Sequence, residues 1–429
     1  MERKILERLE KWKNREDRKP LLLEGARQVG KTWVAKEFGS RFYSQIAYIN
    51  FDKEKSLKDV FARSLSPDML ISSISAVLGQ RIDPENTLLI FDEVQEEPRA
   101  LTSLKYFCED APQYNIIATG SFMGIALHQG TSFPVGKVQL EKMYPLSFTE
   151  FLEAMGHKQM ADILGSGDVE AITSLKETYK DYLRMYYVVG GMPEAVKSFA
   201  ANRDYNIARD IQNEIIELYR HDFSKHAPVT MIPRLNQVWD SIPAQLSREN
   251  RKFMYGQIAK GSRAKDFEAA ITWLSDCGLI HLVHRVSKPG MPLKSYSEMS
   301  AFKIFLNDVG LLGALGELEV RAVVEGSRIF EEFKGAMTEQ YVLQQLISEM
   351  KLTPYYYSTE NSRGEIDFLI QKDGKILPIE VKAEENLQAK SLKAFTGKFD
   401  MHGIRISMSD YREQDWLTNY PLYAFAKLL

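Results

Sequence analysis

The stretch Gly25-Ala26-Arg27-Gln28-Val29-Gly30-Lys31-Thr32 follows the apolar run Leu21-Leu22-Leu23 and precedes a segment with helical spacing. It matches the pattern G-x-x-x-x-G-K-[ST], which binds phosphate where a strand precedes it and a helix follows. The glycines let backbone N–H groups curl around phosphate oxygens, and the start of the helix adds partial positive charge. We therefore expect residues 25–32 to bind ATP, with the Lys31 ammonium on the β- and γ-phosphates and the Thr32 hydroxyl on Mg²⁺. The alternative is a glycine turn that carries Lys-Thr by chance.

A second apolar run, Leu88-Leu89-Ile90-Phe91, ends in the acidic pair Asp92-Glu93. We expect Asp92 to hold Mg²⁺ through water, and Glu93 to orient and deprotonate an attacking water. A third run, Ile116-Ile117-Ala118, ends in Thr119-Gly120-Ser121, and Ser121 would lie near the γ-phosphate. Two simpler interpretations stay open: the acids mark the solvated end of a strand, and Ser121 caps a helix.

Strand-length apolar segments alternate with helical patterns from residue 20 to residue 145. Such alternation predicts parallel βαβ units and a doubly wound α/β sheet. The predicted strands are Pro20–Glu24, Gln45–Phe51, Thr87–Asp92, Tyr114–Gly120 and roughly Lys137–Tyr144.

The remainder of the chain changes character twice. Residues 146–226 are helical, with a turn at Gly190-Gly191-Met192-Pro193. Residues 228–310 give helices followed by two short strands near 279–283 and 303–306, which is the order of a winged helix. Residues 325–429 form another α/β pattern: a helix around Ile329–Met350, strands near Tyr355, Glu365–Ile370 and Lys375–Lys382, and a helix from Leu387. At a soft ~150 residues per domain, 429 residues accommodate a division into 1–155, 156–227, 228–324 and 325–429.

Several longer motifs resemble those of one prokaryotic family of AAA-type ATP-binding proteins, the AAA_14/DUF4143 type. The motifs lie at 23–32, 91–95, 119–121, 144–152 and 190–195. The resemblance extends over essentially the whole chain. It implies nucleotide binding and a sheet whose sensor strand lies between the two Walker strands, and it implies no particular substrate.

The source of a cation for the γ-phosphate stays open. Relatives carry Gly-Arg before the motif at 144–152, whereas this chain has Gly136-Lys137. Lys137 offers a point charge but lacks the planar fork of arginine. Arg99 is the second candidate, and its alternative is a solvated arginine at the start of a helix.

The segment from Arg248 to Lys294 holds nine Lys or Arg and four Asp or Glu, in a chain of net charge −3. In a winged helix that reads DNA, Arg263 and Lys265 would lie on the helix that enters the major groove. The alternative is a packing module whose charges face solvent.

Near the C-terminus, Asp367 belongs to one predicted strand, and Glu380 and Lys382 share one face of the next. Together with Glu339 on the preceding helix, these residues resemble the PD-(D/E)xK nuclease core. In that core, carboxylates hold Mg²⁺ at a phosphodiester and the lysine polarises water or the transition state. The alternative is a nuclease-like fold used only for contact, with Glu380 and Lys382 as an ion pair of ~0–1 kcal/mol.

Composition limits the class of protein without naming it. Hydrophobic residues make up 44% and charged residues 26%, which indicates a globular chain, and the two cysteines cannot form a disulfide framework. We expect a cytoplasmic ATPase that binds ATP and Mg²⁺, has no membrane segment and acts on DNA. The second hypothesis is a regulatory switch or scaffold in which nucleotide state controls contact with a protein partner or with further copies of the chain.

Overall fold

The structure is a computed structural model that describes residues 1–121, 133–248, 252–258, 260–324, 331–359, 364–385 and 388–429. The chain divides into two compact units. The N-terminal unit comprises Arg3–Tyr144 with Asp276–Leu279, and the C-terminal unit comprises Met1–Glu2, Pro145–Ser275 and Ile280–Leu429. The finer four-part division expected from the sequence stays a prediction.

The N-terminal unit has a five-stranded sheet in the order β2-β3-β4-β1-β5, and every neighbouring pair is parallel. The predicted α/β class with a parallel sheet is therefore confirmed. Strand β4 (Asn115–Gly120), which ends just before Ser121, lies between two other strands. These are β1 (Leu21–Glu24), which leads to the phosphate loop, and β3 (Thr87–Asp92), which ends at Asp92. The elements of this unit are α1 (Ile5–Lys13), β1 (Leu21–Glu24), α2 (Lys31–Phe42), β2 (Gln45–Asn50), α3 (Lys55–Arg63), α4 (Pro67–Leu78), β3 (Thr87–Asp92), η1 (Val94–Glu96), α5 (Pro98–Asp110), β4 (Asn115–Gly120) and β5 (Gln139–Lys142).

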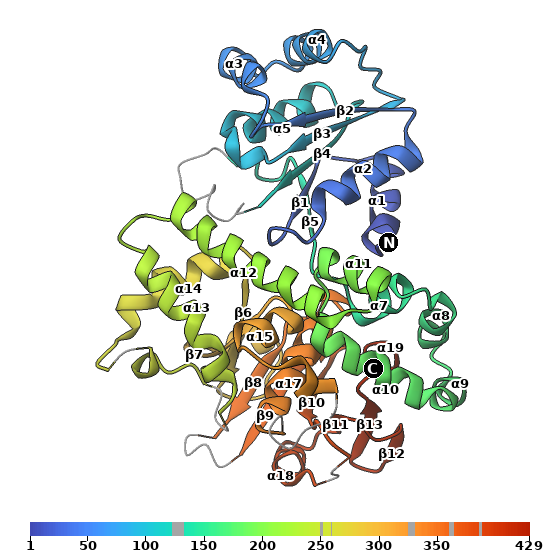
Figure 1. Ribbon diagram of the computed structural model, residues 1–429, viewed down its shortest axis with the longest axis vertical. Helices are drawn as coiled ribbons and strands as arrows, with labels where there is room; N and C mark the ends of the chain where they lie inside the picture. The colour runs from blue at the N-terminus through green and yellow to red at the C-terminus, as the bar shows by residue number, and fades with distance from the viewer. Residues whose placement is uncertain (122–132, 249–251, 259, 325–330, 360–363, 386–387) are drawn as a thin grey trace. The chain divides into compact units, whose positions relative to one another are not determined.

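Helices cover both faces of this sheet (Figure 1). The face with Ala47, Ile49 and Phe91 forms an apolar core with α3, α4 and α5. The other face packs against α2, where the Cα of Gly39 lies so close to Ile46 that an added Cβ would be 2.7 Å from its Cδ1. Alternation along each strand supplies apolar side chains to both layers, as a doubly covered parallel sheet requires.

The C-terminal unit contains the remaining elements. In chain order they are α7 (Phe148–Ala154), α8 (Lys158–Ser166), α9 (Val169–Ser174), α10 (Lys176–Val189), α11 (Pro193–Asn202), α12 (Tyr205–His226), α13 (Ile232–Leu246), η2 (Tyr255–Gln257), α14 (Ala264–Asp276), β6 (Ile280–Val286), η3 (Leu293–Tyr296), β7 (Ser297–Leu306), α15 (Val309–Leu315), α16 (Val320–Val324), α17 (Glu331–Ser348), β8 (Tyr355–Ser358), β9 (Glu365–Lys372), β10 (Lys375–Val381), α18 (Lys390–Phe399), β11 (Gly403–Ser407), β12 (Arg412–Gln414), β13 (Leu417–Pro421) and α19 (Phe425–Leu428). The predicted helix starts at Ile329 and Leu387 lie outside the described residues.

An eight-stranded sheet in the order β12-β13-β11-β10-β9-β8-β6-β7 runs through this unit. The antiparallel pair β6–β7 comes from the segment expected to be a winged helix, and β6 pairs with β8 at Arg285 and Tyr356. These two strands therefore extend the C-terminal sheet, and they do not end as a free-standing wing. Helix α18 contacts this sheet through Phe395 and Phe399, whose rings pack against Tyr357 of β8.

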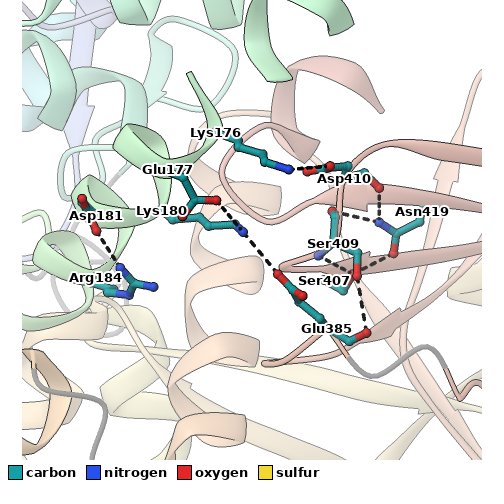
Figure 2. Close-up of polar contacts among 10 residues, drawn as sticks. All are labelled: Lys176, Glu177, Lys180, Asp181, Arg184, Glu385, Ser407, Ser409, Asp410 and Asn419. Carbon is teal, nitrogen blue, oxygen red and sulfur yellow. Dashed lines mark hydrogen bonds and ion pairs between the residues drawn. The ribbon is translucent and has the colours of Figure 1, made fainter. Parts of the chain in front are cut away.

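Two lysines of helix α10 form ion pairs with the loop that follows β10 and with the loop between β11 and β12 (Figure 2). Lys176 Nζ lies 2.8 Å from Asp410 Oδ2, and the nearly buried Lys180 Nζ lies 3.2 Å from Glu385 Oε1. Tyr179, which lies between these two lysines in the sequence, stacks its ring on Tyr423 at 5.3 Å between centroids. The predicted helical region and the C-terminal α/β region thus share one core.

A buried carboxylate joins the Gly190–Pro193 turn to α15 and α17. Asp308 Oδ2 accepts hydrogen bonds from Gly191 N at 2.6 Å and from Gln344 Nε2 at 3.1 Å, and Oδ1 accepts one from Leu311 N at 3.1 Å. Gly191 O in turn accepts from Leu146 N at 2.7 Å. Burial raises the pKa of Asp308 above its ordinary value, and the surrounding hydrogen-bond donors only partly offset this rise. Gly191 therefore has close partners on two sides, Asp308 at its N–H and the Leu146 backbone at its carbonyl.

We predict that Gly191→Ala destabilises the C-terminal unit by about 1–3 kcal/mol, because the new methyl group would meet backbone that cannot move aside. An added Cβ would lie 2.2 Å from Leu146 O. Gly165→Ala in α8 is the matched control, since nothing lies within 4 Å of its added Cβ. Thermal and urea unfolding of both variants measures the difference. Equal stability of the two would show that the turn tolerates a side chain.

Candidate nucleotide-binding site

The phosphate loop, residues 25–32, connects β1 to α2. Two of its residues have backbone conformations that favour glycine. Gly25 has φ +149° and Gly30 has φ +93°, and a Cβ on Gly25 would lie 2.3 Å from Met143 O. Arg3 braces the loop from outside: its guanidinium donates to Val29 O at 3.0 Å and to Tyr144 O at 2.7 Å. The loop is therefore pre-formed by backbone shape and by one buried arginine.

The Lys31 ammonium lies within the loop. Its Nζ donates to Gly25 O at 3.0 Å, to Ala26 O at 2.8 Å and to Ser121 Oγ at 3.0 Å. Burial lowers the pKa of Lys31 to about 8, and the carboxylates of Glu93 and Asp92 oppose that shift. The structure thus brings Ser121 to Lys31, at the carboxyl end of the sheet.

The Asp92 carboxylate is held by side chains from three other elements. Oδ1 accepts from Thr32 Oγ1 at 2.9 Å and from the Thr119 hydroxyl. Oδ2 accepts from Tyr48 OH at 2.6 Å and from Asn50 Nδ2 at 3.3 Å. The Thr32 hydroxyl and the Asp92 carboxylate are hard oxygen donors side by side, so they fit a Mg²⁺ ion held between the protein and phosphate.

Glu93 follows Asp92 in a left-handed conformation with φ 54°. Gln95 Nε2 donates to Glu93 Oε2 at 2.5 Å, and the Glu93 carboxylate is close enough to Lys31 to act on its pKa. Thus Glu93 lies beside the phosphate loop. Tyr48, Asn50 and Gln95 were not among the residues expected from the sequence.

The two cation candidates have partners of their own. Lys137 Nζ lies 2.9 Å from Glu109 Oε1, and Arg99 Nε donates to Phe61 O at 2.8 Å. Neither contact involves the phosphate loop. The source of a cation for the γ-phosphate therefore stays open.

In the C-terminal unit, Asp367 and Glu380 lie on the neighbouring strands β9 and β10. Lys382 Nζ lies 2.9 Å from Glu380 Oε1, and Asp367 Oδ2 accepts from Val381 N at 2.7 Å. Burial raises the pKa of Glu380 above its ordinary value. The Lys382 ammonium opposes this shift and the Asp367 carboxylate adds to it, and the net shift is upward. Glu380 Oε2 is buried with no hydrogen-bond partner among the described residues. The three residues predicted to share a site are thus neighbours.

Glu339 has a different neighbour. Its Oε2 lies 3.9 Å from Nζ of the fully buried Lys303, which also pairs with Glu365. Within the described ranges, no group of three or more His, Cys, Asp or Glu residues is arranged to hold a metal ion.

Arg263 and Lys265 flank the start of α14, and both are exposed. Asp266 Oδ2 accepts from Arg263 N at 3.1 Å, which satisfies one backbone donor at this helix start. The two basic side chains are therefore available on the surface of the C-terminal unit.

Comparison with known proteins assigns the class of the N-terminal unit. Residues 17–152 match the AAA_14 family of AAA domains, and residues 334–425 match a domain of unknown function, DUF4143. Residues 180–322 match another domain of unknown function, DUF8612. Residues 17–152 are therefore similar to AAA domains and residues 334–425 to DUF4143 domains, as the sequence motifs predicted. No curated protein matches the chain.

Solved structures show distant likeness. A Walker-type ATPase of Pyrococcus abyssi is 16% identical with TM-score 0.45, over 73% of this chain and 95% of that one. The Aeropyrum pernix Orc1 protein in complex with DNA is 15% identical with TM-score 0.27, over 73% and 90%. Cdc6p from Pyrobaculum aerophilum is 11% identical with TM-score 0.24, over 72% and 88%. With TM-scores below 0.5, these likenesses carry no conclusion for this chain. In the part of the chain that the structure describes, no helix has the length and apolar character to span a membrane.

The lowered pKa of Lys31 predicts pH-dependent nucleotide binding. Phosphate binding requires the protonated ammonium, and above a free-protein pKa of about 8 the lysine is mostly neutral. Binding at pH 9 must then take up a proton, and affinity falls by up to about tenfold per pH unit above 8. Calorimetry of ATP binding in buffers of different ionisation enthalpy measures the uptake. Lys31→Arg is the control, because a guanidinium does not titrate there. Equal uptake at pH 7 and pH 9, after subtraction of the Lys31→Arg values, contradicts the assignment.

Proposed function

We propose that the N-terminal unit binds ATP with Mg²⁺ and hydrolyses it. The observation that carries the proposal is the Asp92 carboxylate, hydrogen-bonded to Thr32 of the phosphate loop and adjacent to Glu93. A hydroxyl, a buried carboxylate and a second carboxylate thus meet beside the loop lysine. Phosphoryl transfer needs these groups at one place, because its catalysis is mostly positioning and charge stabilisation.

Each residue has a defined part in this reaction. Residues 25–30 offer backbone N–H groups to phosphate oxygens, and Lys31 exchanges its carbonyl partners for β- and γ-phosphate oxygens. Thr32 and Asp92 would hold Mg²⁺, which when bound neutralises charge that develops on the phosphates. Glu93 takes a proton from the attacking water, and Ser121 lies where it can contact the γ-phosphate. Gln95 fixes the Glu93 carboxylate until water arrives.

We expect Glu93→Gln to retain ATP but to lose hydrolysis by roughly 10²–10⁴-fold, because the amide cannot accept the water proton. Lys31→Ala should abolish both binding and turnover, since the β/γ-phosphate charge is then uncompensated. Calorimetry gives binding and phosphate release gives turnover. Parental turnover in Glu93→Gln would exclude Glu93 as the base, and unchanged affinity in Lys31→Ala would defeat the site.

We further propose that the C-terminal unit contacts DNA through Arg263, Lys265 and the surrounding basic segment. Support comes from the excess of basic residues between 248 and 294 and from the exposure of both side chains. The chain order of α13, α14, β6 and β7 matches that of a winged helix, in which a helix such as α14 enters the major groove, although β6 and β7 here also extend the C-terminal sheet. Because the net charge of the whole chain is −3, attraction to phosphate would be local to this surface.

DNA affinity should therefore fall steeply with salt, and the Arg263→Ala/Lys265→Ala double variant should reduce the slope of log affinity against log salt by about 2. The charge-matched control is Lys11→Ala/Lys158→Ala, because both lysines are exposed and lie outside the basic segment. Fluorescence anisotropy with a short duplex over a salt series measures both. A slope that the two double variants alter equally would assign Arg263 and Lys265 to solvent.

For the DUF4143 domain we propose a metal-dependent phosphodiester site formed by Asp367, Glu380 and Lys382. The unpartnered Oε2 of Glu380 supports a cation at this position, because a buried carboxylate oxygen without a partner is costly. The 2.9 Å contact of Lys382 with Oε1 supports the alternative, an inactive fold with an ion pair. Glu339 as a third ligand would have to leave Lys303.

Asp367→Ala and Glu380→Ala should each lower Mn²⁺ affinity, whereas Lys382→Ala should keep the metal and lose plasmid nicking. The full chain with ATP is used, because β6 and β8 belong to one sheet. The control is Lys375→Ala, an exposed lysine at the other end of β10. Absence of both metal binding and nicking would leave the regulatory switch or scaffold as the function of this unit.

A further inference from the structure

We propose that Tyr48, assisted by Asn50, is a positioning residue that selects which oxygen of Asp92 faces the metal. The inference rests on the proposed Mg²⁺–ATP function of the N-terminal unit and adds residues from β2 to it. Neither side chain belongs to the phosphate loop or to the acidic pair.

The geometry begins with strand register. β2 and β3 are parallel neighbours, with Asn50 beside Asp92 and Tyr48 beside Ile90. Alternation along β2 buries Ala47 and Ile49 in the core with α3, α4 and α5. Tyr48 and Asn50 therefore point to the opposite face, where they lie beside the Asp92 carboxylate.

The two Asp92 oxygens have different partners. Oδ2 accepts from Tyr48 OH at 2.6 Å and from Asn50 Nδ2 at 3.3 Å, whereas Oδ1 accepts from the hydroxyls of Thr32 and Thr119. Thr32 is the residue whose hydroxyl would ligate Mg²⁺. The Tyr48 bond thus keeps Oδ2 turned away from the phosphate loop and leaves Oδ1 on the loop side.

Tyr48 is itself fixed from the other side. The Lys36 ammonium lies 3.5 Å from the centroid of the Tyr48 ring, and Lys36 belongs to α2, the helix that begins at Lys31. A cation over the ring and a carboxylate at the hydroxyl restrain both ends of the side chain. Tyr48 therefore connects α2 to Asp92 independently of Thr32.

Loss of the Tyr48 hydroxyl frees the carboxylate to rotate, so part of the metal's binding energy must then order it. The expected effect is on Mg²⁺ and not on nucleotide contacts made by the loop and Lys31. A hydrogen bond to a charged group supports an increase of about tenfold in the Mg²⁺ concentration for half-saturation.

The test compares Tyr48→Phe with the parent by calorimetry of ATPγS binding, in EDTA and over a MgCl₂ series. We expect Kd in EDTA within about twofold of the parent, which also reports that the site is folded, and an Mg²⁺ midpoint raised about tenfold. Asn50→Ala should shift the midpoint in the same direction by less, because its bond is longer. The control is Tyr43→Phe, which removes a hydroxyl bonded to Asn115 Oδ1 at 2.9 Å, near the start of β2.

Four outcomes overturn the inference. An unchanged Mg²⁺ midpoint in Tyr48→Phe shows that Asp92 is ordered without the phenol. An equal shift in Tyr43→Phe, or a matching loss of affinity in EDTA, assigns Tyr48 to general stability. If Mg²⁺ leaves ATPγS affinity of the parent unchanged, the proposed function itself fails, and that result is visible before any variant is made.

Discussion

The Asp92 carboxylate is the point on which the nucleotide site depends, because it accepts hydrogen bonds from elements on both sides of β3. The donors are Tyr48 and Asn50 of β2, Thr32 of α2 and Thr119 of β4. A parallel sheet makes this possible, since the carboxyl ends of its strands meet at one edge. A carboxylate 3% exposed and bonded to four donors also fixes the spacing of these strands. The same bonds that stabilise the sheet edge therefore preset the geometry offered to metal and phosphate.

The two candidate sites treat their charges differently. At the phosphate loop, the Lys31 ammonium is paired with carbonyl and hydroxyl oxygens that a phosphate can replace. In the DUF4143 domain the carboxylates already have lysine partners: Glu380 has Lys382, and Glu339 and Glu365 have Lys303. Removing one partner of a buried pair is costly, because it leaves a charge uncompensated. A metal at Glu380 must therefore compete with Lys382 or use the free oxygen Oε2, whereas the phosphate loop is ready for its ligand.

Local sequence signals predicted the N-terminal unit well, because its chemistry lies in short motifs at strand ends. Thr87–Asp92 has the predicted bounds, and the other four strands begin and end within two residues of them. Tyr48 and Asn50 were missed although the signal was present: they alternate with the apolar Ala47 and Ile49 on a strand that ends level with Asp92. Their role depends on strand order, which places β2 beside β3, and no motif encodes that order. The three strands β11, β12 and β13 were missed as well, since each has only three to five residues and so short a run carries weak periodicity.

Pairing between distant segments explains why the C-terminal unit was harder to predict. A two-stranded hairpin read locally looks like a wing, but hydrogen bonds from β6 to β8 join segments about seventy residues apart in sequence. The same holds for α10, whose Lys176, Tyr179 and Lys180 contact loops and an aromatic ring of the C-terminal α/β region. Because Asp308 binds both the Gly191 backbone and Gln344, the helical segment and α17 cannot separate without exposing a buried carboxylate. The region that matches DUF4143 is therefore part of the core of this unit whether or not it cuts DNA, so its presence in the chain is not by itself an argument for catalysis.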